Sequence, residues 1–169
     1  EVRQKNCAIS HYEQSKRSDE MPVFFNKEIS NSVKDNKIEL ATQIANEAVA
    51  VFPNDPTLRY TRAKANFMIE RYDDAIADCL KAVEIKPDFS KAHFLIAKCY
   101  MKKNEPKKAR FFVRRTLFYD KENVSAAEMI GQIKDMIHMQ KEEKMRRQMQ
   151  QQQQEIGAAG DNVVYAADG

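Results

Sequence analysis

PTLRYTRAKANFMIERYDDAIADCLKAVEIKP, residues 56–87, predicts two helices in succession. The first is expected over residues 57–70 and the second over residues 72–85. Asp73 and Asp74 would lie in the first turn of the second helix, where negative charge interacts favourably with the helix dipole. A proline then ends the second helix, because it lacks the amide hydrogen that a helix interior needs.

A period of 34 residues runs through the chain and predicts repeated helix pairs. Two pairs of prolines keep this step, Pro22 with Pro56 and Pro53 with Pro87. Four further columns keep it as well: Ala41, Ala75 and Ala109; Ala48, Ala82 and Thr116; Val49, Val83 and Leu117; and Ala63, Ala97 and Gly131. Small side chains let paired helices approach closely. One pair cannot bury its apolar face alone, so neighbouring pairs are expected to stack.

The repeated unit is similar to a known family. Residues 56–89 resemble a tetratricopeptide repeat through Ala63, Tyr72, Ala75, Ala82 and Pro87. Residues 22–55 resemble a preceding repeat through Ala41, Ala48 and Pro53, and residues 90–123 a following one through Ala97, Tyr100 and Ala109. The resemblance implies an all-α fold in which helix-turn-helix repeats stack into a right-handed superhelix with a long C-terminal helix.

The two ends of the chain fall outside these repeats. Residues 1–20 are interpreted as the second helix of a truncated preceding repeat or as an unrelated N-terminal helix. Residues 124–155 are expected to form a capping helix with a charged, Gln-rich extension. This extension either stays solvated, or docks a partner or self-associates as coiled coils do. Residues 156–169 are expected to form a flexible tail because they combine glycines with small residues.

The sequence shows no catalytic or metal-binding pattern. Its three histidines, at positions 11, 93 and 138, stand apart from any nucleophile motif. There is no HExxH, no CxxC and no glycine-rich phosphate loop. We therefore predict a protein that is not an enzyme and has no cofactor or metal.

Cysteine usage and hydropathy indicate the compartment. No apolar run reaches the roughly 18–20 residues of a membrane span. The three cysteines, Cys7, Cys79 and Cys99, are odd in number and widely spaced. This pattern indicates reduced thiols rather than a disulfide framework. We expect a cytoplasmic protein, with the nucleus as the alternative.

The resemblance also implies a concave groove lined by the first helix of each repeat. The residues assigned to this groove are Asn26, Ser30, Tyr60, Lys64, Phe67, Lys91, Phe94, Lys98 and Met101. Its lysines can pair with carboxylates and its aromatic side chains can bury apolar groups, which predicts a protein partner with an acidic or amphipathic segment. In the alternative interpretation the aromatics pack between helices and the lysines are solvated.

Some co-chaperones of this family clamp the C-terminal carboxylate of heat-shock chaperones with lysine, asparagine and arginine side chains. The matching positions here are Asn26, Ser30, Thr61, Lys91 and Leu95, and only Lys91 has the expected residue. The missing side chains remove most charge-assisted hydrogen bonds to a carboxylate. A standard clamp is therefore not expected, although a chaperone contact of another kind is an alternative.

Charge is distributed unevenly. The chain has a net charge of +3, but residues 86–121 contain 11 Lys and Arg against 3 Asp and Glu, a net +8 that leaves −5 for the remainder. The residues of this basic face are Lys102, Lys103, Lys107, Lys108, Arg110, Arg114 and Arg115. Three interpretations compete: a solvated face, a surface for an acidic protein, and a phosphate-binding surface whose affinity would fall steeply with salt.

These observations favour a non-enzymatic scaffold or adaptor that mediates protein–protein contacts as a subunit of a larger assembly. One alternative is a chaperone adaptor that lacks the standard carboxylate clamp. A second alternative is a nucleic-acid-associated factor that uses the basic third repeat. This alternative is the less favoured one, because a protein is the expected partner and nucleic acid is not.

Overall fold

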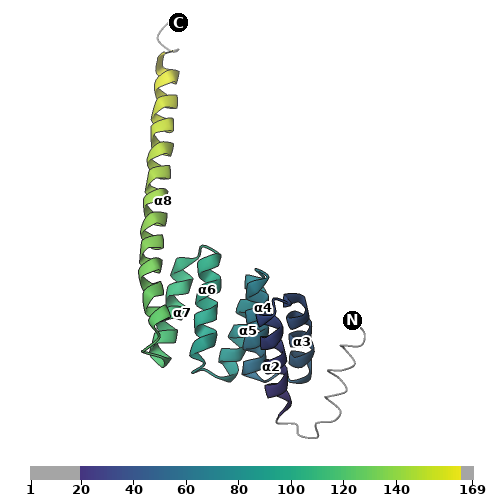
Figure 1. Ribbon diagram of the computed structural model, residues 1–169. Helices are drawn as coiled ribbons and strands as arrows, with labels where there is room; N and C mark the ends of the chain where they lie inside the picture. The colour runs from purple at the N-terminus through teal and green to yellow at the C-terminus, as the bar shows by residue number, and fades with distance from the viewer. Residues whose placement is uncertain (1–19, 165–169) are drawn as a thin grey trace.

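The computed structural model describes residues 20–164, and this part of the chain consists of seven helices without strands (Figure 1). In order they are α2 (Met21–Lys34), α3 (Ile38–Val51), α4 (Pro56–Met68), α5 (Tyr72–Ile85), α6 (Ser90–Lys102), α7 (Pro106–Tyr119) and α8 (Val124–Val164). The predicted all-α fold of stacked helix pairs is confirmed. The expected helix over residues 1–20 lies outside the described residues, apart from its last position.

Two local features set where the helices begin and turn. The Asp55 carboxylate caps α4 by accepting a hydrogen bond from the backbone amide of Leu58 at 2.8 Å. Asn36, Glu70 and Asn104 have φ angles of 58°, 60° and 59°, and they recur at the 34-residue step. This left-handed conformation follows the first helix of each pair and reverses the chain into the second.

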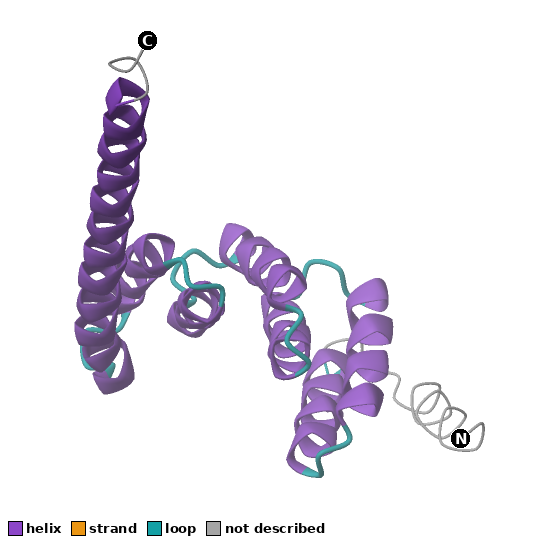
Figure 2. Cartoon of the chain, turned by 90° about the horizontal axis from the view of Figure 1, so that it is seen from above, coloured by secondary structure: helices purple, strands orange, loops and turns teal. Residues whose placement is uncertain are grey.

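Three apolar clusters form the core, and each shares a helix with the next. The first joins α2 and α3 to Leu58 of α4, and the second joins α4 and α5 to α6. The third joins α6 and α7 to α8. Ala63, Ala75 and Ala82, predicted as close-approach positions, are fully buried in the second cluster. Viewed from above, the pairs follow one another along a curved path (Figure 2).

The second cluster also contains two free cysteines. Cys79 and Cys99 are both fully buried and form no disulfide. Burial raises the pKa of both thiols, that of Cys99 to about 11. These thiols are therefore protonated at neutral pH and serve as small apolar side chains.

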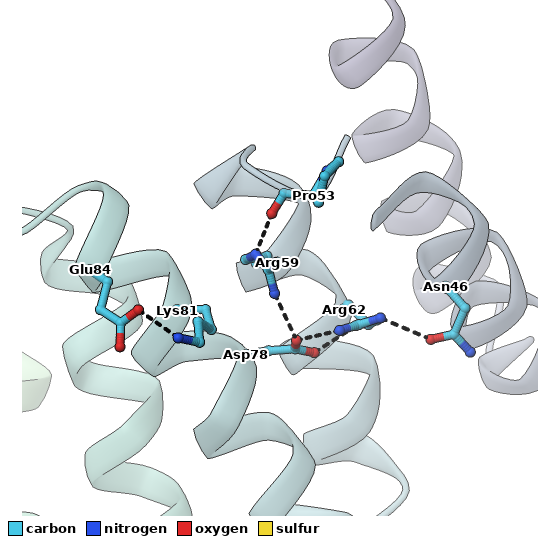
Figure 3. A network of polar contacts seen from close by, with 7 residues as sticks. All are labelled: Asn46, Pro53, Arg59, Arg62, Asp78, Lys81 and Glu84. Atoms are coloured by element: carbon cyan, nitrogen blue, oxygen red, sulfur yellow. Dashed lines mark hydrogen bonds and ion pairs between the residues drawn. The ribbon is translucent and has the colours of Figure 1, made fainter. Parts of the chain in front are cut away.

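A buried ion pair links the two helices of the central unit. Arg62 on α4 donates from Nε and Nη2 to the two carboxylate oxygens of Asp78 on α5, at 2.7 and 2.5 Å (Figure 3). Arg59 approaches the same carboxylate at 3.8 Å and donates to the carbonyl of Pro53 at 2.6 Å. The hydrogen bond with Asp78 raises the pKa of Arg62. Asp78 is only 6% exposed, and these two arginines are the cations that approach its carboxylate.

The last helix packs on the stack and then leaves it. Ala126, Met129 and Ile133 of α8 belong to the third cluster, and the Gln140 amide donates to the Asn104 carbonyl at 3.0 Å. Residues 141–155 are all exposed, and the helix projects away from the stack (Figure 1). At 41 residues α8 is about 62 Å long. The helix continues through Val164. Residues 156–164, the first nine of the expected flexible tail, are therefore helical.

Among the residues that the structure describes, no helix is both long and apolar enough to cross a membrane.

Replacing Asp78 with alanine is expected to lower the free energy of unfolding by about 2–3 kcal/mol, because Arg62 loses a bidentate partner in a partly buried site. The matched control is Glu84→Ala, which removes the exposed Lys81–Glu84 pair and should cost under about 0.5 kcal/mol. Urea unfolding followed by circular dichroism measures both. Equal effects for the two variants would contradict the assigned role of Asp78.

Replacing Glu70 with glycine is expected to raise the free energy of unfolding by about 0.5–1 kcal/mol, because glycine adopts positive φ without steric strain. In the control, Asp35→Gly, the residue has an ordinary φ of −76° and the substitution should give no gain. Thermal unfolding of both variants measures the difference, and destabilisation by Glu70→Gly would refute the prediction.

Stability is expected to fall as pH decreases below about 6.5, the unperturbed value of histidine. Burial lowers the pKa of His93; a hydrogen bond with the Pro87 carbonyl at 3.0 Å opposes this effect, and Arg115 lowers the pKa further. The folded state then binds the proton more weakly than the unfolded chain, so stability is lost as pH falls through the two pKa values.

The free energy of unfolding at pH 7 and pH 5.5 tests this expectation. His93→Phe should reduce the pH dependence, since phenylalanine can keep the stacking with Tyr119, whose ring centroid lies 5.6 Å from that of His93. His138→Gln, which removes a histidine at an exposed position on α8, is the matched control. An unchanged slope in His93→Phe would show that other groups cause it.

Candidate functional site

The first helices of successive pairs adjoin one another and build one side of the stack. α2 contacts α4, and α4 in turn contacts α6. Lys64 on α4 and Lys91 and Lys98 on α6 are exposed on these helices. None of the three forms an ion pair with another described residue. The Lys98 ammonium lies 4.8 Å from the centroid of the Phe94 ring, a cation–π contact that holds the charge over α6.

The aromatic residues predicted for the groove are half-buried within the protein itself. Tyr60 packs on Phe89 with ring centroids 5.1 Å apart, and Phe67 packs on Tyr72 at 5.6 Å. Phe94 and Met101 lie against the cluster that α8 completes. These side chains offer a partner only their outer edges, whereas Lys64, Lys91 and Lys98 are exposed.

The positions that match a carboxylate clamp are occupied by contacts within the protein. The Thr61 hydroxyl is buried and lies 2.5 Å from Oδ1 of Asn26 and 2.8 Å from the Thr57 carbonyl. The Asn26 amide donates to the Pro22 carbonyl at 2.9 Å. Ser30 is half-buried and Leu95 is buried. Lys91 is therefore the exposed cation among the five clamp positions.

The predicted basic face separates into paired and unpaired cations. Lys103 forms an ion pair with Asp73 of the preceding unit, and Lys108 pairs with Glu105 at 2.6 Å. The hydrogen bonds with these carboxylates raise the pKa of both lysines. The remaining five, Lys102, Lys107, Arg110, Arg114 and Arg115, are exposed and have no ion pair within the described part of the chain.

Two features of the surface were not predicted from the sequence. Phe118 on α7 is 71% exposed, and the same helix carries the exposed Phe111 and the unpaired arginines. A polar depression between α3, α4 and α5 surrounds the Arg62–Asp78 pair, with Asn46 and Asn66 in its lining. The exposure of Phe118 could have been predicted from the repeat, because the positions one and two periods earlier hold Glu84 and Ala50 rather than large apolar residues.

The described residues bring no group of three metal-ligating side chains together.

This chain is similar to a family model and to curated proteins in its repeat region. The tetratricopeptide-repeat family model matches residues 70–133. The inactive TPR repeat-containing thioredoxin TTL3 of Arabidopsis thaliana is 33% identical over 70 residues, which cover 41% of this chain and 10% of that protein. The chain spans 10–15% of the length of such curated relatives.

Solved structures resemble it over most of the described helices. The first TPR of Spaghetti (RPAP3), bound to the HSP90 peptide SRMEEVD, is 20% identical with a TM-score of 0.67 and covers 69% of this chain and 93% of that chain. The Hsp90 co-chaperone Cns1 of Saccharomyces cerevisiae is 25% identical with a TM-score of 0.68 and covers 80% of this chain and 46% of that one.

The match of residues 70–133 to the tetratricopeptide-repeat family model agrees with the 34-residue period and with the stacked helix pairs of the structure. Stacked repeats of this kind form extended surfaces, and the same fold supports many different functions.

Proposed function

We propose that this chain is a non-enzymatic adaptor that captures an acidic segment of a partner protein along α4 and α6, within a larger assembly. The observation that carries the proposal is the set of exposed lysines without ion pairs, Lys64, Lys91 and Lys98, on two adjoining first helices. Carboxylates are the complementary ligands, since charge-assisted hydrogen bonds to ammonium groups are stronger than neutral ones.

The half-buried aromatic residues fit the same ligand. The outer edges of Tyr60, Phe67 and Phe94 lie on the helices that carry the lysines. An extended segment with alternating acidic and apolar side chains could place carboxylates on the lysines and methyl groups on these edges. Asn26, Ser30 and Met101 complete the proposed surface at its borders.

A chaperone is a second candidate partner, and the comparisons favour it. A structural neighbour is bound to the HSP90 peptide SRMEEVD, and another is an Hsp90 co-chaperone. The clamp positions other than Lys91 lack the required groups here, so a chaperone segment would bind through its acidic side chains rather than its terminal carboxylate. Two buried free cysteines fit a reducing compartment, and we propose the cytoplasm or nucleus for this activity.

The double variant Lys91→Glu/Lys98→Glu should weaken binding of a fluorescent SRMEEVD peptide by about tenfold or more, because two attractive contacts become repulsive. The matched control is Lys121→Glu/Lys134→Glu, which makes the same charge change at exposed positions away from α4 and α6. Fluorescence anisotropy at low salt measures affinity, and circular dichroism checks the fold. Unchanged binding by the Lys91 and Lys98 variant would refute the proposed site.

A further inference from the structure

One face of α7 carries an exposed stripe of aromatic and basic side chains. Lys107, Phe111, Arg114 and Phe118 follow one another at steps of four, three and four residues, which places them in one row along the helix. Phe111 is 56% exposed and Phe118 is 71% exposed. The opposite face of α7, with Ala109, Val113 and Thr116, is buried in the stack. The stripe therefore lies on the side of α7 that its neighbours leave open.

The cations of this stripe are available to a ligand. Arg110 and Arg115 flank the row, and with Lys107 and Arg114 they form no ion pair within the described part of the chain. The Arg115 guanidinium lies 5.7 Å from the centroid of the Phe111 ring, which orients it beside the aromatic surface. Arginine and aromatic side chains together are the residues that most often carry binding energy in protein interfaces.

The repeat provides an internal reference for these positions. One period earlier, α5 has Ala77 where α7 has Phe111, and Glu84 where α7 has Phe118. Both α5 residues are exposed, as the phenylalanines are, and the central pair folds with them. Folding of a repeat therefore does not require an aromatic side chain at either position. The phenylalanines of α7 need another explanation, and large exposed apolar groups in a row mark contact surfaces.

The extent of the stripe indicates the kind of ligand. Glu105 immediately precedes α7 and pairs with Lys108 at 2.6 Å, and Asp120 follows α7. Between them α7 is 14 residues long, about 21 Å. The two phenylalanines are seven residues apart, about 10.5 Å along the axis, or two helical turns. A short helix with apolar side chains two turns apart matches this spacing, and the unpaired cations of the stripe favour acidic side chains around them.

We propose that the outer face of α7, formed by Lys107, Arg110, Phe111, Arg114, Arg115 and Phe118, docks an acidic amphipathic helix of a partner protein. Apolar side chains two turns apart in that helix contact Phe111 and Phe118. Its flanking aspartates and glutamates pair with Arg110, Arg114 and Arg115. This surface lies on a second helix of a pair, so it is separate from the lysines of α4 and α6 and adds a second contact to the adaptor.

The test uses a synthetic helical peptide of about 18 residues, or five turns. Leucines form one face of this peptide and glutamates fill the remaining positions; a second peptide has lysine in place of every glutamate. The full chain should bind the glutamate peptide and bind the lysine peptide at least about tenfold more weakly. Phe111→Ala/Phe118→Glu, which installs the residues of α5, should weaken binding of the glutamate peptide by about tenfold or more while helicity and Tm stay unchanged.

Two controls separate this surface from others. Ile85→Ala removes an apolar side chain that is 43% exposed outside the stripe, and it should leave the affinity unchanged. Lys91→Glu/Lys98→Glu should also leave binding of the helical peptide unchanged. Equal affinity for the two peptides, or full binding by Phe111→Ala/Phe118→Glu, would overturn the proposal.

Two further results would assign the stripe to another ligand and so also overturn the proposal. One is single-stranded RNA bound more tightly than the glutamate peptide and released by the Phe111 and Phe118 substitutions, in a gel-shift assay. The other is a dimer of the full chain, seen in sedimentation velocity, that the same substitutions convert to a monomer.

Discussion

The stack depends on the close approach of helices at alanine side chains that are fully buried. Ala63, Ala75 and Ala82 occupy the interface between α4 and α5 and the start of α6. A larger side chain at such a position would force neighbouring helices apart, since protein interiors have little room for added methylene groups. Because these positions recur at a fixed period, each pair packs on the next in the same way, and all first helices lie on the same side.

This arrangement separates the surfaces of the molecule by their position in the pair. First helices contact first helices, so the exposed lysines of α4 and α6 lie on one side. Second helices face outward, and α7 presents its phenylalanines and arginines there. The Arg62–Asp78 pair fixes α4 against α5, while Lys103 and Asp73 connect two successive units by charge. The ion pairs that stabilise the repeats and the exposed side chains proposed to bind partners are thus different residues.

Sequence periodicity predicted the helices and their close contacts because both are local and repeated. It could not predict the Arg62–Asp78 pair, whose members belong to different helices and to no repeated column. The half-burial of Phe94 and Met101 likewise depends on where α8 packs, a non-local contact with no pattern in the residues themselves. Lys103 forms its ion pair with Asp73, which belongs to another unit. The net charge of residues 86–121 therefore overstated the number of unpaired cations on the basic face.

We propose that exposed lysines on the first helices bind acidic side chains without the help of a terminal-carboxylate clamp. The most direct measurement compares SRMEEVD with a free C-terminus and the same peptide amidated, both titrated against the full chain at low salt. We predict binding of both peptides with affinities within about twofold, because Asn26, Thr61 and Leu95 provide no clamp. Loss of binding on amidation, or no binding of either peptide, would contradict this mode of binding.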